Sequence, residues 1–194
     1  CKKRNKILIC ILVLLMKTII LESYGFQDKF KHHDLIQDQL INFLNRAAND
    51  FDCHPRDKID YLDWQKSTDM DREWVKFIKP LLEKHFLKCI KNLKLNTVHI
   101  RNLWFQKYKK DGVHNWHIHG NNYTGVYYLK FPEHSTKTQL VNKQKILEID
   151  AKEGDIVIFP SFVVHRSPKI TEDIEKIIVS FNLDFDTLEE DYKV

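Results

Sequence analysis

The sequence predicts a mainly β protein in which helices pack outside an antiparallel sandwich or barrel. Two observations favour this fold class. Residues 97–185 form a series of short β-rich runs separated by turns, and residues 34–94 contain two stretches with apolar residues at helical spacing. Many short strands joined by turns are typical of antiparallel sandwiches and barrels. We therefore expect one domain whose helices precede its sheets.

Size and composition agree with a single globular domain. A chain of 194 residues can bury a core that needs no disulfide or metal to stabilise it. Its 43% hydrophobic and 30% charged residues exclude wholesale disorder and repeat-dominated sequence. The formal net charge of +4 comes with lysines spread along the chain, so the sequence indicates no clear nucleic acid partner and no clear membrane partner. The oligomeric state stays unknown at this point.

The N-terminal segment has a basic stretch, Lys2–Lys6, before ten apolar residues from Ile7 to Met16. This order is that of a signal peptide, but the apolar run is too short for a spanning helix and no small-residue cleavage site is evident. Residues 1–15 are thus an upstream extension or a targeting segment, and residues 16–194 form the domain. If Met16 is the start, MKTIILESYGF opens the domain with a strand. We expect a cytoplasmic protein, with a targeting signal left open.

The cysteines do not indicate a disulfide framework. They lack CxxC pairs and the density of a disulfide scaffold, and we interpret all four as free thiols: Cys1, Cys10, Cys53 and Cys89. Cys89 falls on the apolar side of a predicted helix, where a thiol behaves as a small buried hydrophobe.

The helical support is predicted within residues 34–94. The stretch from Asp34 to Asn49 takes Asp34 as N-cap and has a helical apolar pattern: Leu35, Ile36, Leu40, Phe43, Leu44 and Ala47. Residues 51–72 have no sustained period and many turn formers, which predicts a long irregular connection bordering the active site. A second helical pattern runs from Trp74 to Leu93, and Pro80 should either kink it or begin a new helix.

The β-rich core is predicted within residues 97–185. We expect strands in 97–108, 123–131, 137–142, 145–150, 155–160, 162–167 and 176–185. Gly154 supplies a tight hairpin turn before the strand at 155–160, and Pro160 ends that strand. The acidic tail 186–194 is a solvated end.

Three of the ten histidines form a metal-binding pattern. His117 and His119, in WHIHGNNYTGVYYL, stand at i and i+2 of an extended segment, so their side chains share a face. His165, in EGDIVIFPSFVVHRSP, can reach the same ion from a returning strand. The other seven are interpreted as satisfied core or surface residues: His32, His33, His54, His85, His99, His114 and His134.

These strings, together with KIIVSFN, resemble the superfamily of 2-oxoglutarate- and Fe(II)-dependent oxygenases over residues 97–185. The resemblance is greatest to a small branch found in marine phage and microbial genomes, with a prolyl-hydroxylase-like core. The family pattern is HxD or HxE, a distal His, and then Arg or Lys, which His117, His165 and Lys176 match. His119 stands where the family usually has a carboxylate. Imidazole is a good ligand for iron, and three histidines leave coordination positions open.

The resemblance implies a double-stranded β-helix, or jelly-roll, core with Fe(II) bound by the three histidines and 2-oxoglutarate beside it. Alternation along 123–129 turns Tyr128 inward, where its hydroxyl can donate to the distal carboxylate of 2-oxoglutarate. On the partner strand, Lys176 would pair with that carboxylate and Ser180 would add a hydrogen bond. Upstream, Gln106 would orient the keto-acid end of the cosubstrate. Its neighbours Trp104 and Tyr108 share that face, where large aromatics are more often core residues.

By this resemblance the protein is a dioxygenase that consumes 2-oxoglutarate and dioxygen, hydroxylates a C–H bond of a protein residue or small metabolite, and releases succinate and CO₂. A prolyl residue is favoured, because YTGVYYL resembles a strand of prolyl hydroxylases. Two alternatives stay open: a cupin-like three-His metal dioxygenase that does not use 2-oxoglutarate, and a non-catalytic jelly-roll binding module with a structural zinc. The substrate is unknown, and residues 51–72 and 115–123 are the loops expected to select it.

Overall fold

The computed structural model describes residues 23–47, 55–91 and 95–185. Within these ranges lie two α-helices, α2 (His33–Arg46) and α3 (Glu73–Lys91). Between them run the short strand β2 (Tyr61–Leu62) and a 3₁₀ helix, η1 (Trp64–Lys66). Neither helix of the described residues is long and apolar enough to cross a membrane. The predicted segment 1–15, most of the strand predicted from Met16, and the acidic tail lie outside the described residues.

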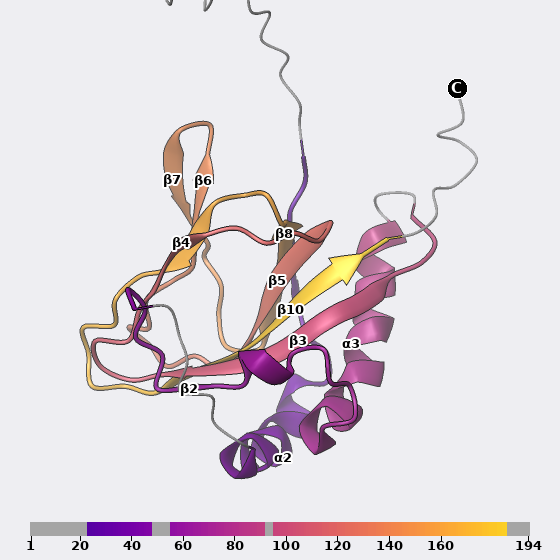
Figure 1. Ribbon diagram of the computed structural model, residues 1–194, viewed down its shortest axis with the longest axis horizontal. Helices are drawn as coiled ribbons and strands as arrows, with labels where there is room; N and C mark the ends of the chain where they lie inside the picture. Colours follow the sequence, from indigo (N-terminus) through magenta and orange to yellow (C-terminus); the bar gives the residue numbers. More distant parts are fainter. Residues whose placement is uncertain (1–22, 48–54, 92–94, 186–194) are drawn as a thin grey trace, which may run out of the picture.

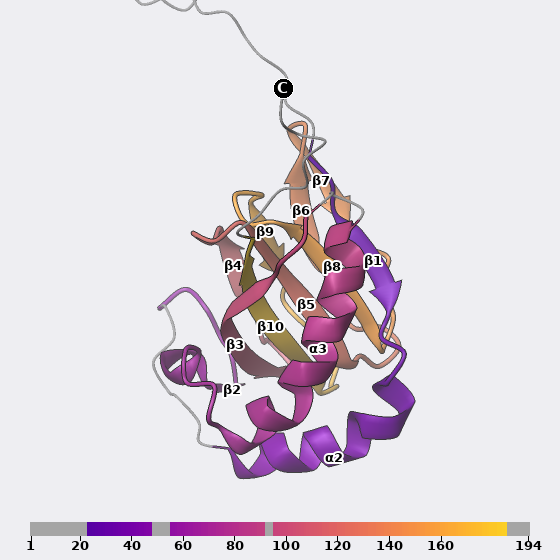
Figure 2. The same ribbon diagram turned by 90° about the vertical axis from the view of Figure 1, so that its right-hand side faces the viewer.

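Two antiparallel sheets form the body of the molecule (Figures 1 and 2). The larger sheet has the order β1-β8-β5-β10-β3-β2, and the smaller one has the order β4-β9-β6-β7. Besides β2, the strands are β1 (Phe26–Lys29), β3 (His99–Tyr108), β4 (His114–His117), β5 (Tyr123–Lys130), β6 (Gln139–Asn142), β7 (Lys145–Glu148), β8 (Asp155–Pro160), β9 (His165–Ser167) and β10 (Lys176–Asp184). The prediction of a jelly-roll core with helices packed outside is confirmed.

The core has two parts, one on each face of the larger sheet. Both helices cover the outer face (Figure 2), where buried side chains of α2 and α3 meet alternate residues of β10 such as Ile177, Val179 and Phe181. The inner face looks toward the smaller sheet and carries a second apolar cluster that includes Val126, Tyr128 and Ile178. Because successive side chains of a strand point to opposite faces, one strand contributes to both clusters.

The start of α2 differs from its prediction. The helix begins at His33 with His32 as N-cap, so Asp34 lies in the first turn and caps no backbone group through its side chain. There its carboxylate still interacts favourably with the helix dipole. Leu35 is 82% exposed, whereas Ile36 and Leu40 are buried. The residues spaced four apart face the sheet, and Leu35 lies outside that stripe.

In α3 the chain passes through Pro80 as one continuous helix, so no second helix begins there. Pro80 is exposed, and its missing N–H costs a hydrogen bond only on the solvent side, while Ile78 and Leu82 remain fully buried. Leu93 lies outside the described residues. Cys89 is a buried free thiol, as predicted, and burial raises its pKa to about 11.

Each of the seven β-rich runs contains a strand, but β1, β2 and β4 lie outside those runs. Gly154 also behaves differently from its prediction. It makes a turn with φ of +83°, but this turn is no hairpin, because β7 and β8 belong to different sheets. Its N–H donates to the carbonyl of Tyr128, and its own carbonyl accepts from the N–H of Phe30. The turn thus ties β8 to the middle of the larger sheet.

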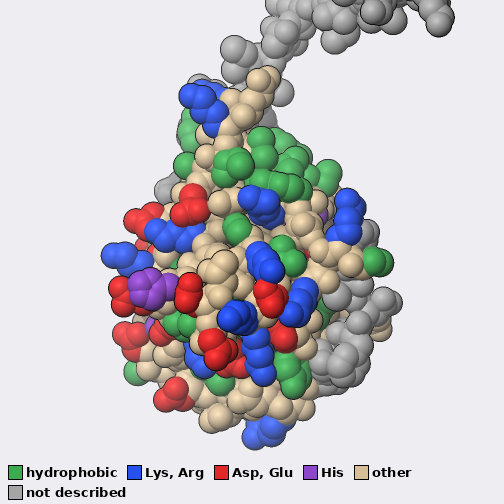
Figure 3. Space-filling model, turned by 90° about the vertical axis from the view of Figure 1, so that its left-hand side faces the viewer, with side chains coloured by type: hydrophobic (Ala, Val, Ile, Leu, Met, Phe, Trp, Pro, Cys, Tyr) green, Lys and Arg blue, Asp and Glu red, His purple; other side chains and the backbone are tan. Residues whose placement is uncertain are grey.

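Large hydrophobic side chains are exposed on the β6–β7 hairpin and in the loop before β9: Val141, Ile146, Leu147, Phe162 and Val164. On the face seen in Figure 3, hydrophobic side chains gather toward the top, the end at which Figure 1 places this hairpin. Lysine, arginine and acidic side chains mix below them.

Candidate metal centre and the adjoining cavity

The three histidines of the metal-binding pattern converge. His117, the last residue of β4, pairs directly with His165, the first residue of β9. The ring centroids of these two are 4.2 Å apart, and each lies 5.1 Å from that of His119. One ligand atom from each ring lies within 4.8 Å of the other two. That this cluster binds a metal stays a prediction, but the geometry required for it is present.

The sequence pattern predicted that His117 and His119 lie on one extended segment with their side chains on the same face. In the structure, His119 lies beyond the end of the strand that contains His117. β4 ends at His117, and the backbone N–H of His119 donates to the carbonyl of Ser161 at 2.9 Å. This bond ties the segment after β4 to the segment after β8, which holds His119 beside the other two rings. The contact joins parts of the chain far apart in sequence, so alternation alone could not reveal it.

Hydrogen bonds fix two of the three rings in a form that can coordinate. His117 Nδ1 lies 2.6 Å from the carbonyl oxygen of Asn115, and His165 Nδ1 lies 2.9 Å from that of Val163. A carbonyl oxygen only accepts, so each Nδ1 carries the proton and each Nε2 keeps its lone pair for a metal. Such second contacts are typical of metal-binding histidines, and an imidazole set fits iron, zinc, nickel or copper.

Burial keeps these rings neutral, which is the ligand form. Burial chiefly, and the neighbouring His117 to a lesser extent, lower the pKa of His119 and of His165 to about 3 each. The pKa of His117 is lowered for the same main reason. A metal ion therefore would not need to displace protons from the cluster at neutral pH.

Lys176 is buried on the inner face with 0% exposure. Its Nζ donates to Ser167 Oγ at 2.8 Å and to the carbonyl of Thr136 at 3.1 Å, and it lies 5.2 Å from the ring centroid of Tyr108. No carboxylate of the described residues pairs with it. Burial lowers its pKa to about 7. An ammonium group so enclosed gains from any anion that can reach it.

The other predicted cosubstrate residues also lie on the inner face. This confirms the predicted alternation of inward and outward side chains along these strands. Ile178 of β10 pairs with Gln106 of β3 and with Tyr128 of β5, and Ser180 occupies the next inward position of β10. Their polar atoms are engaged within the protein. The hydroxyl of Tyr128 donates to Thr138 Oγ1 at 2.8 Å, and that of Ser180 donates to Gln106 Oε1 at 3.1 Å.

The space that these residues enclose is small. An inner cavity of about 30 Å³ is lined by the three histidines and by Gln106, Ser180 and other inward residues of β3, β5 and β10. Such a volume holds about one or two water molecules. A dicarboxylate therefore enters this region only if side chains on the inner face move.

The structure adds His114 to the site, although the sequence interpretation left it as an ordinary residue. Its ring stacks on that of His117, with centroids 3.8 Å apart and planes 17° apart. Its Nε2 lies 3.7 Å from Asp57 Oδ2, and its Nδ1 lies 3.3 Å from Gln106 Nε2. Burial lowers its pKa to about 3. Strand alternation offered no signal for it, because residues i and i+3 of a regular strand face opposite sides, whereas the pairing of β4 with β9 is irregular between His114 and His117.

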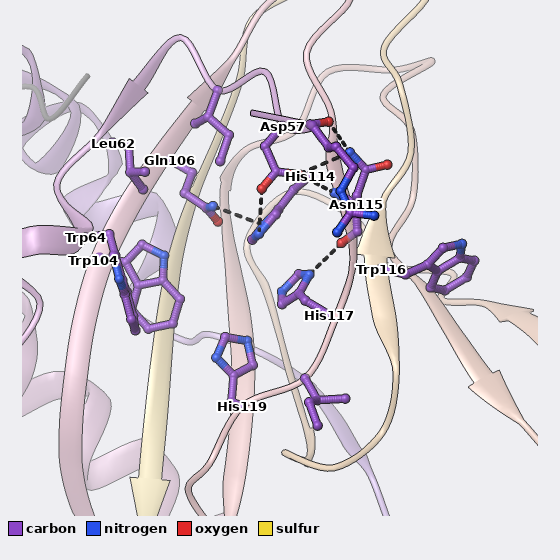
Figure 4. Close-up of a pocket in the computed structure, with 13 residues that line it drawn as sticks. Asp57, Leu62, Trp64, Trp104, Gln106, His114, Asn115, Trp116, His117 and His119 are labelled. Carbon is purple, nitrogen blue, oxygen red and sulfur yellow. Dashed lines mark hydrogen bonds and ion pairs between the residues drawn. The ribbon is translucent and has the colours of Figure 1, made fainter. Parts of the chain in front are cut away.

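Asp57 reaches the site from the irregular connection, as expected for a segment bordering it. Its Oδ1 accepts from the backbone N–H of Asn115 at 2.8 Å, next to the carbonyl that orients His117 (Figure 4).

An outer cavity of about 380 Å³ opens beside the histidines (Figure 4). Both loops predicted to select the substrate contribute to its wall, Asp57, Leu62 and Trp64 from one and Trp116 and His119 from the other. Trp104 and Gln106 of β3 form part of the same wall. This cavity gives a ligand access to the histidine cluster.

No protein-family model matches the sequence. A comparison with curated proteins also found no match. The structure, in contrast, is similar to solved ones at low sequence identity. An oxidoreductase of the 2OG-Fe(II) oxygenase family from Burkholderia pseudomallei has a TM-score of 0.62 at 10% identity, over 76% of this chain and 77% of that one.

Two further similar structures have their ligands named. The viral collagen prolyl hydroxylase of Paramecium Bursaria Chlorella virus-1, in its 2-oxoglutarate complex, has a TM-score of 0.58 at 16% identity, over 82% of this chain and 95% of that one. HygX from Streptomyces hygroscopicus, with nickel and 2-oxoglutarate bound, has a TM-score of 0.64 at 10% identity, over 84% and 83%. The chain thus has the fold of the 2-oxoglutarate- and Fe(II)-dependent oxygenase structures, and within that fold it carries three histidines that could bind a metal.

Proposed function

We propose that the protein is a 2-oxoglutarate- and Fe(II)-dependent dioxygenase. It would hydroxylate a C–H bond of a protein residue or a small metabolite and release succinate and CO₂. The observation that carries the proposal is the convergence of His117, His119 and His165 inside a jelly roll of this fold. The buried Lys176, which lacks a carboxylate partner among the described residues, supports it.

The three histidines would hold the iron, and their donor set fits it. Bound iron supplies the redox chemistry that couples dioxygen to the oxidation of cosubstrate and substrate. The protein's own part is to keep the rings neutral and oriented, through burial and through the carbonyls of Asn115 and Val163. With histidine in place of a carboxylate, the ligand set leaves the full charge of the ion uncompensated, which strengthens its attraction for a dicarboxylate.

Lys176 would anchor the distal carboxylate of 2-oxoglutarate. It now donates to one hydroxyl and one carbonyl oxygen, and a carboxylate is a stronger partner for an ammonium group than either. Tyr128, Ser180 and Gln106 would exchange their present partners for cosubstrate oxygens as the inner cavity widens. The cosubstrate thus supplies the anion that this buried cation lacks.

The substrate is proposed at the level of two classes. Among the similar structures are prolyl hydroxylases, one of them in complex with a peptide fragment, and HygX with hygromycin B bound. Proteins with this fold therefore bind both peptides and small molecules. A prolyl residue remains the favoured protein target on the resemblance of the β5 sequence.

A second candidate is a three-His dioxygenase that does not use 2-oxoglutarate. The inner cavity of about 30 Å³ favours it, as do the internal hydrogen bonds of Tyr128 and Ser180, because no space for a dicarboxylate is preformed. A non-catalytic zinc module fits less well. Structural zinc sites are closed by four protein ligands, and the cluster among the described residues has three.

Anaerobic titration separates these functions. The protein loaded with Fe(II) should develop a visible charge-transfer band when 2-oxoglutarate is added, and aerobic incubation should form succinate in a metal-dependent way. Lys176→Ala should abolish the band. Lys130→Ala is the matched control, because Lys130 pairs with Glu175 at the surface and should leave the band unchanged. Iron binding with no band and no succinate would favour the second candidate.

A further inference from the structure

We propose that the outer cavity binds a flat, uncharged aromatic ring of the substrate, which stacks in the corner formed by Trp64 and Trp104. The inference rests on the proposed function, because it names the kind of substrate group that would be presented beside the histidines, and it replaces the prolyl target that the β5 sequence favours. The carrying observation is the arrangement of aromatic rings between the histidine cluster and the surface.

Tryptophan gathers at this cavity. The chain has four tryptophans, and three of them occur in the cavity wall, while Trp74 is buried in the first turn of α3. Trp64 is 41% exposed although it is the most apolar side chain of η1. An indole left half-exposed at the mouth of a cavity offers surface that a ligand could cover.

The rings form a path that leads outward from the metal site. Trp104 is 4% exposed, and its ring centroid lies 5.8 Å from that of His119. Trp64 lies against Trp104 with centroids 4.6 Å apart and planes at 78°. Two indoles at this angle form a corner in which a flat ring can stack on one face and place its edge on the other. Figure 4 shows this pair across the cavity from the histidines.

Size and polarity limit what the cavity accepts. Its volume of about 380 Å³ lies at the lower end for ligand sites, which run from about 300 to 1,000 Å³. Ile59 and Leu62 add further apolar wall beside the indoles. A single ring-bearing side chain or a small aromatic metabolite fits this space.

Charge favours a neutral ring over a cation. Apart from histidines, the described lining residues with ionisable side chains are Arg56 and Asp57, a base and an acid. An indole corner next to a carboxylate could attract a cation. Here, however, Asp57 already accepts hydrogen bonds from the backbone and side-chain nitrogens of Asn115, and it lies 3.7 Å from His114. The carboxylate of Asp57 is therefore engaged by groups of the protein itself.

The test follows the four indole N–H signals of the ¹⁵N-labelled full chain loaded with Zn(II), a redox-inactive and diamagnetic ion. The probes are N-acetyl-L-phenylalaninamide, N-acetyl-L-prolinamide and N-acetyl-L-lysinamide. The phenylalanine probe should shift the signals of Trp64 and Trp104. Trp74 should not respond, because its Nε1 is buried and donates to Asp63, which makes it an internal control.

Trp64→Ala should weaken binding of the phenylalanine probe about tenfold, the upper end of what an aromatic contact contributes. Since Trp64 is partly exposed, this variant should fold. Tyr61→Ala is the matched control: Tyr61 is 43% exposed on the same connection, does not line the cavity, and should leave binding unchanged.

Tighter binding of the proline or lysine probe would overturn the aromatic class, and so would binding that Trp64→Ala leaves intact. Zn(II) and 2-oxoglutarate affinities are measured on the same sample. If both bind while the phenylalanine probe shifts neither Trp64 nor Trp104, the ring inference is wrong and the proposed function stands. If neither binds, the proposed function is wrong and the ring inference falls with it.

Discussion

The two faces of the larger sheet differ in the buried side chains that they carry. On β10, the outward residues Ile177, Val179 and Phe181 are fully buried against the helices and carry no polar atoms beyond the backbone. The inward residues Lys176 and Ser180 are also buried but polar, with the apolar Ile178 between them. Burying polar groups costs free energy unless they are paired, whereas apolar burial stabilises. One strand thus places stability on one face and chemistry on the other.

The largest expected effect is a loss of stability from a substitution on the outer face. Phe181→Ala should lower the free energy of unfolding by about 3 to 5 kcal/mol, because Phe181 is 0% exposed and lies 4.4 Å from the ring centroid of Phe86. Ser180→Ala, on the next residue, should cost only about 1 kcal/mol, since it removes one hydrogen bond. Urea denaturation measures both values. Equal losses would contradict the division between the faces.

On the inner side, His165→Ala should reduce the affinity for Zn(II) or Fe(II) more than about a hundredfold. Loss of a residue that only hydrogen-bonds to a metal ligand already lowers metal affinity by about 10- to 100-fold, and His165 would be a ligand itself. Calorimetric titration gives the affinity. His134→Asn is the control, because His134 lies exposed in a loop at φ of 69°, a conformation that asparagine tolerates. Unchanged affinity in His165→Ala would remove this histidine from the site.

Lys176 should make folding stability depend on pH. Its pKa in the folded protein, about 7, lies below that of the unfolded chain, so between these values the unfolded state binds the extra proton. Stability should therefore rise as the pH increases from about 7 to about 10, the usual lysine pKa. Lys176→Met should flatten this slope and leave the protein as stable or more stable at pH 7. Urea midpoints measured across that range test it, and an unchanged slope would contradict it.

The smallest expected effect is at His114. His114→Ala should weaken metal binding about tenfold, because the ring that stacks on His117 and contacts Gln106 is lost. His114→Phe keeps the stacked ring and should recover part of that affinity. If both variants bind Zn(II) as the unsubstituted protein does, His114 takes no part in positioning His117.

The sequence interpretation was most accurate where the pattern is local. The seven β-rich runs contain strands, and the inward alternation on β3, β5 and β10 was correct through Gln106, Tyr128 and Ser180. It was less accurate at ends and turns. Asp34 does not cap α2, Leu35 faces solvent, and Gly154 makes no hairpin, because each depends on what the segment packs against.

The amino-acid sequence by itself determined which side chains of a strand share a face, because the two-residue period of a strand is a property of the local backbone. Only the tertiary structure decided which partners those side chains have. It placed Asp57 and His114 beside His117, engaged Tyr128 and Ser180 internally, and set Trp64 against Trp104 at an open cavity. Except for the stack of His114 on His117 within β4, these contacts join different segments of the chain, and their geometry follows from how the two sheets and the connection pack together.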